Sequence, residues 1–466
     1  MAGVLLTHCN HLYFDRKQVR KMQPYPPLQT LLAAACLRRD GWQAALFDST
    51  FEDPEEGFSK ALREQSPELL VICEDHFNFL TKMCLVRNRE LAFRMGELAR
   101  EAGVPVIIAS SDASDNIIPY LKQCADFVVL GEVEHTLSEL VRNYRDPGGV
   151  RGIAFRDPDT GTLRITPKRD PISNLDSLPF PSWDLVDIEA YRTAWIQAHG
   201  QFSLNGVSSR GCPFQCNWCA KPVFGSHYHA RSAQSVACEM QFLKTRFRPD
   251  HLWFADDIFA LSPSWTYAFA DAVEERSAQI PFKMQSRCDL MTRNTVSALR
   301  RAGCAEVWMG AESGSQKILD AMDKGTRLDQ VFHARENLAG HGIRVGLFLQ
   351  FGYPGETWDD IRKTIDMVRR AEPDAIGVSV SYPLPGTRFY DLVSQQLGAK
   401  KNWNDSDDLS IMFQGRFSSE FYLALRDALH AEVDGAPVEE VAAMWSQVNS
   451  MEAVSVESTV ALWTSC

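Results

Sequence analysis

The sequence predicts an α/β protein with two successive series of β–α units and a small C-terminal segment. Three observations favour this class. Short apolar runs alternate with amphipathic stretches over roughly the first 145 residues. A stretch rich in turn residues and proline follows over 148–183, and a second alternation begins near residue 203. At 466 residues, the chain is long enough for two or three domains.

The first series predicts a doubly wound, flavodoxin-like sheet. The expected strands are Val4–Thr7, Ala44–Phe47, Leu69–Cys73, Val104–Ala109 and Phe127–Leu130. The expected helices are Leu28–Arg39, Glu56–Gln65, Asn88–Ala102, Ile117–Gln123 and Glu134–Tyr144. Five such alternations imply a parallel sheet that is covered on both faces. Ligands of these sheets bind at the carboxyl ends of the strands.

The next stretch predicts a hairpin and a linker between domains. Val150–Arg156 and Thr162–Pro167 flank the turn-rich segment Asp157–Gly161. The prolines within Leu178–Trp183 exclude a regular helix there. We therefore expect four parts, at 1–147, 148–195, 196–395 and 396–466.

The second series contains six β–α units, which are too few for an eight-unit barrel. The expected strands are Ser203–Ser208, Leu252–Ala255, Phe282–Ser286, Glu306–Gly310, Val345–Gly352 and Ile376–Ser381. Helices such as Ala233–Thr245 and Asp360–Arg370 lie between them. The charged segment Asn402–Asp408 and a helix at Ser419–Glu432 are expected to close the open side of the sheet or to cap a substrate site.

Composition bounds the choice of partners. With 45% hydrophobic and 23% charged residues, the chain reads as an ordinary soluble globular protein. The net charge of −12 argues against a general affinity for nucleic acid or anionic membranes. No apolar stretch reaches the roughly 20 residues that a membrane span needs, and the run Met1–Leu6 is too short for the core of a signal peptide.

Three of the twelve cysteines form a tight motif. Cys212, Cys216 and Cys219 have the spacing C-x-x-x-C-x-x-C, which supplies three thiolates from one short loop. A cubane iron–sulfur cluster has four irons, so three thiolates leave one iron free for another ligand. A structural zinc site would need a fourth ligand, and no C-x-x-C pair follows within zinc-finger distance. A zinc knuckle or three unrelated thiols are the alternatives.

With Trp218 directly before its third cysteine, this loop resembles that of the radical S-adenosylmethionine (SAM) enzymes. The resemblance covers roughly residues 200–390 and implies a partial (β/α)6 TIM-like barrel. It also implies a [4Fe-4S] cluster whose open iron binds the amino and carboxylate groups of SAM, and cleavage of SAM to a 5′-deoxyadenosyl radical. Because cysteine-ligated clusters need a reducing compartment, we expect a cytoplasmic protein.

Two carboxylates stand at the end of the second barrel strand. Burying Asp256 and Asp257 together is costly without a cation, and the resemblance assigns this position to the methionyl amine of SAM. Since neighbours on a strand point in opposite directions, only one of the pair can face the ligand squarely. The other can serve as a helix N-cap. The sequence alone does not separate the two roles.

Further candidates follow the third and fourth strands. Gly310–Ser315 resembles the family's G-x-E-S-G segment, in which Glu312 and Ser313 can accept hydrogen bonds from ribose hydroxyls. Arg287, after the third strand, can pair bidentately with the methionyl carboxylate, although a structural ion pair is an almost equal alternative.

The loops after the fifth and sixth strands also match the family. Phe351–Thr357, which contains Gly352, resembles the G-x-P-G-E-T segment whose backbone contacts adenine. Turn formation at Pro354–Gly355, with Thr357 capping a helix, is compatible with that role. Pro383–Thr387 is expected to shape the site only.

The first domain resembles the cobalamin-binding domain that precedes the radical domain in one large subgroup. Tyr25–Leu28 and Gly131–Glu134 carry the resemblance. There are three departures. The cobalt-ligating motif D-x-H-x-x-G is missing, Ser110–Asp112 replaces a glycine pair, and Glu74–His76 replaces a serine-containing segment. Carboxylates near the anionic tail of cobalamin would be unfavourable, unless Glu74 and Asp75 face solvent.

The resemblance predicts methyl transfer from cobalamin to an unactivated centre of a small molecule or natural product, with electrons from a flavodoxin or ferredoxin. Radical dehydrogenation, epimerisation or rearrangement without cobalamin is an alternative, in which the first domain only shapes the substrate cavity. A non-catalytic iron–sulfur sensor is another. A methylthiotransferase is disfavoured because no second tight cysteine triplet exists. Four histidines are possible contributors to a ligand site in the first domain: His8, His11, His76 and His135.

Overall fold

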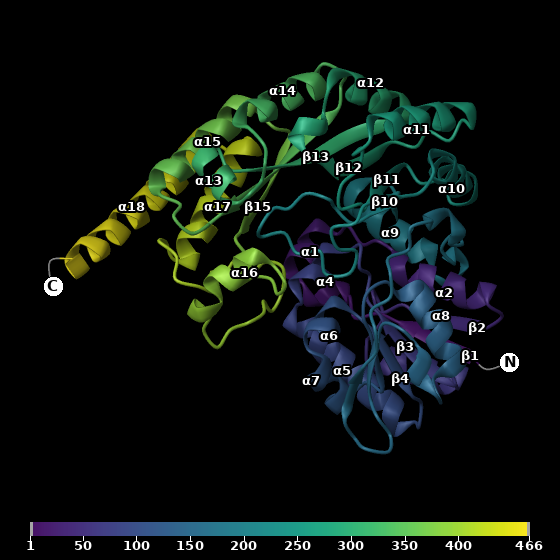
Figure 1. The fold of residues 1–466 in the computed structure, drawn as a ribbon. Helices are drawn as coiled ribbons and strands as arrows, with labels where there is room; N and C mark the ends of the chain where they lie inside the picture. The colour runs from purple at the N-terminus through teal and green to yellow at the C-terminus, as the bar shows by residue number, and fades with distance from the viewer. Residues whose placement is uncertain (1–2, 464–466) are drawn as a thin grey trace.

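The computed structural model describes residues 3–463, with the side chains of 3–452. Two sheets make up its two main parts, and the helices α1 and α4 lie between them (Figure 1). Within the described residues, no helix is long and apolar enough to cross a membrane.

The first sheet has the strand order β2-β1-β3-β4-β5-β6-β7, and its first five strands are parallel. This is the flavodoxin-like order that the sequence predicts. Its strands are β1 (Gly3–Thr7), β2 (Gln43–Phe47), β3 (Leu69–Cys73), β4 (Val106–Ala109), β5 (Phe127–Val129), β6 (Ile153–Arg156) and β7 (Leu163–Ile165). The helices of this domain are α1 (Arg16–Lys21), α2 (Leu28–Arg39), α3 (Glu56–Gln65), α4 (Phe79–Met83), α5 (Val86–Glu101), α6 (Ser111–Asp115), α7 (Ile117–Gln123) and α8 (Val133–Asn143).

Both faces of this sheet are covered, because successive residues of a strand point to opposite sides. Val4 and Leu6 of β1 pack with the apolar residues of α2 and α8. Leu5, between them, packs with residues of α3, α5 and α7 on the other face. The fully buried strand β3 reads as a continuous apolar run for the same reason.

The hairpin does not stand apart as a connector. β6 pairs antiparallel with β5, and β7 pairs antiparallel with β6, so the hairpin extends the first sheet. Pairing satisfies the backbone groups of β5, which would otherwise form an open edge. The linker after the prolines contains a helix that the sequence analysis did not identify, α9 (Ile188–His199), which buries Tyr191 and Trp195 against the rest of the protein.

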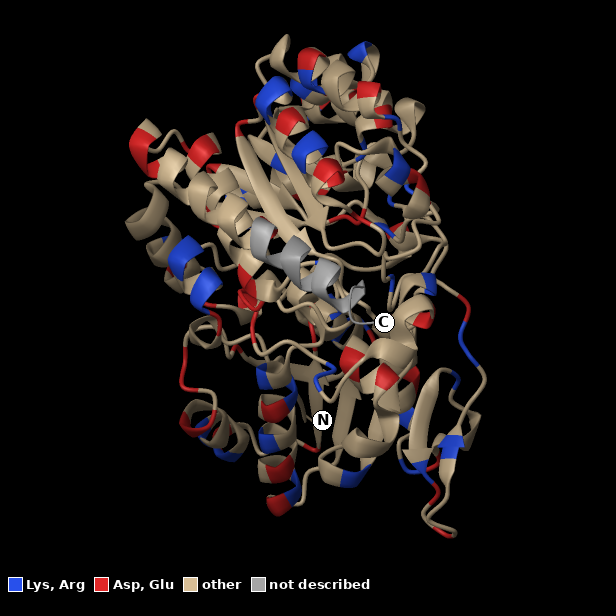
Figure 2. Cartoon of the chain, turned by 90° about the vertical axis from the view of Figure 1, so that its left-hand side faces the viewer, with Lys and Arg blue, Asp and Glu red and all other residues tan. Residues whose placement is uncertain are grey.

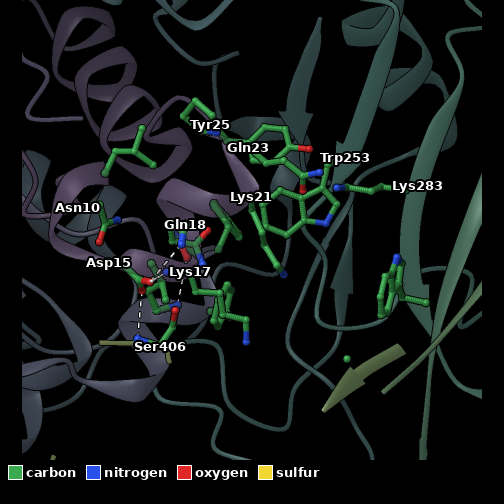
Figure 3. A pocket seen from close by; sticks show the side chains of 18 of the residues that line it. Asn10, Asp15, Lys17, Gln18, Lys21, Gln23, Tyr25, Trp253, Lys283 and Ser406 are labelled. Carbon is green, nitrogen blue, oxygen red and sulfur yellow. Dashed lines mark hydrogen bonds between the residues drawn. The ribbon is translucent and has the colours of Figure 1, made fainter. Parts of the chain in front are cut away.

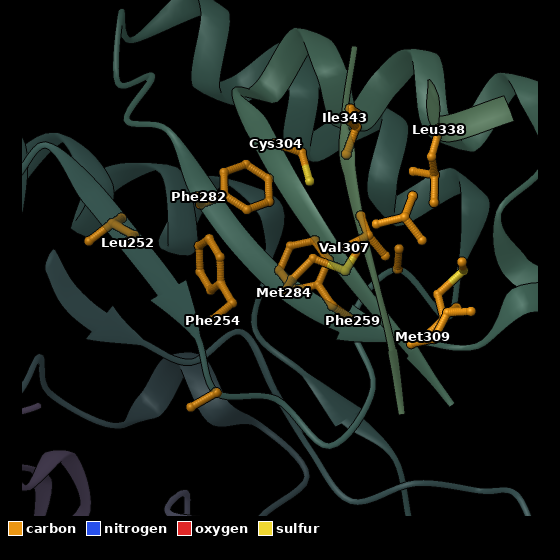
Figure 4. Packing of buried hydrophobic residues seen from close by; sticks show 14 of the residues in the cluster. Leu252, Phe254, Phe259, Phe282, Met284, Cys304, Val307, Met309, Leu338 and Ile343 are labelled. Carbon is orange, nitrogen blue, oxygen red and sulfur yellow. The ribbon is translucent and has the colours of Figure 1, made fainter. Parts of the chain in front are cut away.

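The second sheet is parallel, with the order β15-β14-β13-β12-β11-β8, and it is the six-stranded partial barrel that the sequence predicts. Its strands are β8 (Ser203–Gly206), β11 (His251–Phe254), β12 (Phe282–Ser286), β13 (Cys304–Glu312), β14 (Arg344–Phe351) and β15 (Ala375–Val380). The helices that follow them are α10 (Ala233–Arg246), α11 (Pro263–Glu275), α12 (Arg293–Ala302), α13 (Gln316–Ala321), α14 (Leu328–Ala339) and α15 (Trp358–Ala371). Figure 4 shows how Phe254, Phe282, Met284 and Val307 pack on the helix-covered side of the sheet.

The last part of the chain contains α16 (Arg388–Val393), α17 (Ser419–Val433) and α18 (Val438–Trp463). α17 packs against the edge strand β15. The charged segment reaches the first domain, where the Trp403 carbonyl accepts a bond from the Val86 amide at 2.9 Å, and the Ser406 amide donates to Asp15 at 3.1 Å. The C-terminal part thus covers the open side of the partial barrel and joins the two domains.

Candidate functional site

The three-cysteine loop follows β8 at the carboxyl edge of the second sheet. A short antiparallel pair, β9 (Ser209–Arg210) and β10 (His229–Ala230), closes the base of the loop. Gly211 has φ +74°, and a Cβ at this position would lie 2.0 Å from the carbonyl oxygen of His227. Only glycine fits directly before the first cysteine. The Lys221 ammonium donates to the carbonyl oxygens of Cys212 (2.8 Å) and Phe214 inside the loop.

The motif cysteines differ from most other cysteines in being accessible. Cys212 and Cys216 are half-buried and Cys219 is exposed, whereas all other described cysteines except Cys238 are buried. The described residues contain no group of three His, Cys, Asp or Glu side chains placed to share one metal ion. A four-iron cluster makes a different demand, because each thiolate binds its own iron. The three accessible thiols on one loop fit that donor set.

The structure gives the two neighbouring aspartates different surroundings. Asp256 is fully buried and accepts bonds from the Ser208 amide (3.1 Å) and from the hydroxyls of Ser208 (2.6 Å) and Ser209. Burial raises the pKa of Asp256 to about 6. Asp257 is half-buried and pairs with Lys82 of α4. Asp256 therefore fixes the start of the cysteine loop, and Asp257 faces the space between the two domains.

Arg287 lies under the cysteine loop. Its guanidinium carbon is 3.6 Å from the centre of the Phe214 ring. It pairs with Asp289 through two bonds of 2.9 and 3.1 Å and donates to the Lys324 carbonyl at 2.9 Å. These contacts correspond to the structural ion pair that the sequence analysis kept as the alternative to carboxylate binding.

The fourth strand ends at Glu312, which has φ +59°, an unusual value for a residue with a side chain. Its carboxylate is 2.7 Å from the Lys324 ammonium, and both groups are buried. The Lys324 ammonium also lies 5.4 Å from the centre of the Trp218 ring, so this pair borders the cysteine loop. Ser313 is turned inwards, where its hydroxyl contacts Thr364 at 3.2 Å and accepts from the Ser315 amide.

Gly352 begins the turn after the fifth strand. Its φ is +75°, and a Cβ would lie 2.8 Å from the Ile411 side chain and 3.3 Å from Tyr422. The Gly352 amide donates to Glu356 at 2.7 Å. Burial raises the pKa of Glu356 to about 8, so this carboxyl group is protonated at neutral pH. Thr357 forms the predicted capping box, through Asp360.

A cavity of about 1050 Å³ lies between the two domains. The first domain borders it with residues that follow β1 and β3, including His8, Asn10 and Asn78. The barrel borders it with inward-facing strand residues such as Trp253 and Trp308. The carboxyl ends of the first sheet and the interior of the second therefore open onto one space.

Glu74–His76 and Ser110–Asp112, which differ from the cobalamin-binding pattern, are buried. Glu74 and Asp75 are buried, so the expectation that they can face solvent is wrong. They are tolerated because backbone amides donate to them, from Cys9 to Glu74 and from Gln29 and Phe77 to Asp75. Burial raises the pKa of Glu74, and that of Asp75 to about 6.

The replacement of the glycine pair has a structural consequence. Ser110 caps α6, and the Ser111 hydroxyl donates to the Thr81 carbonyl at 2.5 Å, which ties α6 to α4. Asp112 pairs with Arg89. Beside them only about 20 Å³ is open. A cavity of this size is too small for a cobalamin tail.

The histidines are distributed over different surroundings. The His8 ring contacts Asp48 at 3.0 Å, and the His11 ring contacts the Ser49 carbonyl at 2.8 Å. Both border the large cavity. His76 is buried with no hydrogen-bond partner for either ring nitrogen, and burial lowers its pKa to about 4. His135 lies on α8 and does not border the cavity.

Sequence reasoning missed Arg210, which lies two residues before Cys212. Arg210 is buried, and its guanidinium binds Glu134 of the first domain and Glu132 at 3.3 Å. Its carbon also lies 5.1 Å from the centre of the Phe224 ring. The Gly131–Glu134 segment thus holds the base of the cysteine loop. The position of Arg210 next to the cysteine motif was a signal for a role at the site. Its partner Glu134 lies 76 residues away, so the sequence did not indicate the pair.

Comparison with known proteins agrees with this arrangement. Residues 207–368 match the model of the Radical SAM superfamily. An uncharacterized methyltransferase of Pyrococcus horikoshii is 27% identical over 340 residues, which are 71% of this chain and 72% of that protein. Hopanoid C-3 methylase of Methylococcus capsulatus is 23% identical over 80% of this chain and 69% of its own. An anaerobic magnesium-protoporphyrin IX monomethyl ester cyclase of Rubrivivax gelatinosus is 28% identical over 283 residues. The matched part is 59% of this chain and 49% of the cyclase.

Solved structures share the whole two-domain fold. The radical SAM methyltransferase TsrM from Kitasatospora setae, with cobalamin and a [4Fe-4S] cluster bound, has a TM-score of 0.68 at 19% identity and covers 85% of this chain and 75% of its own. The cobalamin-dependent SAM radical enzyme OxsB, with aqua-cobalamin bound, has a TM-score of 0.72 at 16% identity and covers 98% of this chain and 72% of its own.

Proposed function

We propose that this chain is a radical SAM methyltransferase that uses cobalamin to methylate an unactivated centre of a small molecule. The observation that carries the proposal is the cavity of about 1050 Å³, which the strand ends of the first domain share with the interior of the barrel. A cofactor at the first domain and a substrate in the barrel would meet there. Relatives with methyltransferase names and cobalamin-bound structures of the same fold support it.

Each predicted site residue has a role within this proposal. Cys212, Cys216 and Cys219 hold the cluster, which supplies an electron for the reductive cleavage of SAM, while cobalamin supplies a methyl carrier. Asp257 faces the amine of SAM, because Asp256 is committed to the Ser208 and Ser209 donors. The buried Asp256 and the inward-turned Ser313 act as positioning residues.

The other candidates surround the remaining parts of SAM. Glu312 accepts from ribose hydroxyls, with Lys324 holding its carboxylate in place. Gly352 presents its backbone to adenine. Arg287 fixes the cysteine loop through Phe214. Trp218 packs beside Lys324.

The residues available to cobalamin are polar groups at the first-domain side of the cavity. Asn10 and Asn78 carry amide groups, and the corrin periphery carries amides that can pair with them. His8 and His11 are held by Asp48 and the Ser49 carbonyl, so they are oriented before a ligand binds. These four side chains are the proposed contacts.

The electron donor is proposed to be a flavodoxin or ferredoxin, and the compartment to be the cytoplasm. The described cysteines are all free, which agrees with a reducing environment. No comparison supports the alternatives of a sensor or of radical chemistry without cobalamin.

The test is anaerobic purification with hydroxocobalamin, followed by iron, sulfide and cobalt quantification and mass spectrometry of 5′-deoxyadenosine after reduction with SAM present. We expect about four irons and one cobalt per chain. The Cys212→Ala variant should lose the cluster and 5′-deoxyadenosine formation. Cys238→Ala is the matched control, because Cys238 is an exposed cysteine outside the motif. A chain that binds iron but no cobalt would disprove the cobalamin part alone.

A further inference from the structure

Three lysines face the same part of the large cavity. Lys17 and Lys21 lie on α1 of the first domain, and Lys283 lies on β12 of the barrel (Figure 3). Within the part of the chain whose side chains are described, no carboxylate lies within 4.0 Å of any of their ammonium groups. Unpaired ammonium groups gathered at one site attract an anion.

Two carboxylates that border the same cavity accept hydrogen bonds from backbone amides. Asp15 accepts from the amides of Lys17 (2.9 Å) and Ser406 (3.1 Å), as Figure 3 shows. Asp250 accepts from the Phe202 amide at 2.8 Å. The three lysine ammonium groups are therefore not neutralised by either of these two carboxylates.

The lysines also act on one another. The Lys21 side chain is exposed to the cavity, but protein surrounds that space. This burial, together with the charges of Lys17 and Lys283, lowers the pKa of Lys21 to about 8. This mutual influence agrees with the placement of the three lysines around one part of the cavity in Figure 3.

Apolar and aromatic surfaces continue from the lysines along the barrel interior. The Lys283 ammonium lies 5.5 Å from the centre of the Tyr25 ring and 5.9 Å from that of Trp253. Trp308 and Phe348, with ring centres 4.9 Å apart, form a second aromatic surface. The indole of Trp308 lies flat across the neighbouring strands, where Gly346 and Gly377 have no side chains. An apolar molecule can bind against these rings.

The lysines lie far from the cysteines. Lys283 is the second residue of β12, whereas the cysteine loop is at the carboxyl edge of the sheet. The remaining residues of β12, from Lys283 to Ser286, span about 10 Å at 3.3 Å per residue. A ligand held by the lysines must extend over about this distance to reach the radical chemistry.

We propose that the substrate is an elongated molecule with an apolar or aromatic body and an anionic end group, and that Lys17, Lys21 and Lys283 bind the anionic end. This proposal rests on the proposed function, since it names the substrate class of the same site. The aromatic rings of Trp253, Trp308 and Phe348 contact the body, and the reacting carbon lies towards the carboxyl edge of the barrel.

The test uses a matched pair of fluorescent probes, 8-anilinonaphthalene-1-sulfonate and its uncharged analogue N-phenyl-1-naphthylamine, with the anaerobically purified full chain. We expect the sulfonate to bind about tenfold more tightly or better, because hydrogen bonds to charged groups are strong. Lys283→Gln and Lys21→Gln should each remove most of this preference without changing the affinity for the uncharged probe, and Lys283→Arg should keep it. Lys60→Gln is the control, since Lys60 pairs with Glu64 outside the cavity.

Two results would overturn the proposal. One is equal affinity for both probes, or equal weakening of both in Lys283→Gln and Lys21→Gln. The other is loss of bound cobalt in those variants, which would assign the lysines to the phosphate of cobalamin instead. Probe binding does not require SAM cleavage, so a chain that shows the charge preference but transfers no methyl group refutes the proposed function and not the binding site.

Discussion

At the scale of single residues, Asp256 and Asp257 show how neighbours in a sequence receive different tasks. Replacing Asp256 with Asn leaves one oxygen for the two serine hydroxyls and puts an amide NH2 where the Ser208 amide now donates at 3.1 Å. We expect Asp256→Asn to lower the free energy of unfolding by about 2 kcal/mol and to lose iron during anaerobic gel filtration. Asp257→Asn breaks only a half-buried pair with Lys82 and should cost less than about 1 kcal/mol.

Denaturant titration under anaerobic conditions measures the difference in the free energy of unfolding. Isothermal titration calorimetry with SAM measures the difference in SAM affinity. Asp257→Asn should weaken SAM binding while leaving iron content unchanged. Equal destabilisation by the two substitutions, with equal SAM affinity, would contradict the separation of their roles.

Glu356 gives a prediction for pH dependence. Its pKa is raised by burial to about 8 from an ordinary value of 4.5, so the folded chain binds a proton more tightly than the unfolded chain. The stabilisation is therefore complete below about pH 4.5 and is lost as the pH rises towards 8.

The isosteric variant Glu356→Gln removes this titration. Between pH 5 and pH 8.5, wild type should lose roughly 4 kcal/mol more of its free energy of unfolding than Glu356→Gln does. Urea denaturation at both pH values measures the difference. Parallel losses in both proteins would show that Glu356 is ionised in the folded state.

At the scale of elements, α8 is joined to β9 by the buried pair of Glu134 and Arg210. Glu134→Ala would leave the buried guanidinium with only Glu132 as its acidic partner, so we expect a loss of roughly 3 kcal/mol in the free energy of unfolding. Glu139→Ala on the same helix is the matched control, because Glu139 pairs with Arg169 at the surface and should cost less than about 1 kcal/mol.

Thermal denaturation separates the two variants. Iron quantification shows whether the pair of Glu134 and Arg210 also positions the cysteine loop. We expect Glu134→Ala to retain less iron than Glu139→Ala. If Glu134→Ala matched its control in both measurements, Arg210 would have another partner when the charge is removed.

The elements that periodicity can identify were predicted well. The ranges Leu28–Arg39, Leu69–Cys73 and Phe282–Ser286 coincide with α2, β3 and β12. The five-residue helices α4 and α6 were not predicted, because one turn of helix carries no period. The bond from the Ser111 hydroxyl to the Thr81 carbonyl holds them together, and no local signal reports a contact across 30 residues.

The same limit applies to the candidate site. The cysteine spacing and the order of the strand-end segments could be predicted, since they are local in sequence. The division of labour between Asp256 and Asp257 depends on which one meets Ser208. The lysine cluster depends on α1 meeting β12, although these segments lie in different domains. Only the folded chain shows such contacts.

At the scale of the whole molecule, the cluster is expected to contribute little to the stability of the two sheets. The three cysteines lie on an irregular loop, outside the hydrophobic clusters that pack against both sheets. Removing iron with a chelator should leave the far-ultraviolet circular dichroism nearly unchanged and shift Tm by only a few degrees. Limited proteolysis should then become faster within 211–228. Unfolding of the barrel on chelation would show that the cluster is part of its core.

Charges of both signs are mixed on the side of the molecule that Figure 2 shows. Lysines and arginines alternate with aspartates and glutamates on the helices of both domains (Figure 2). Many of these charges form exposed pairs, such as Arg301 with Asp271 and Glu274. Exposed pairs of this kind add little stability. The cavity lysines differ from them, because no described carboxylate lies within 4.0 Å of their ammonium groups.

The hairpin of β6 and β7 has a practical consequence. Its turn around Asp159 is exposed, and none of its residues borders the large cavity. A peptide epitope inserted after Asp159 would give a means of immobilising the chain on a sensor surface at the rim of the first sheet. Ligands could then be passed over tethered molecules while both chain termini stay unmodified.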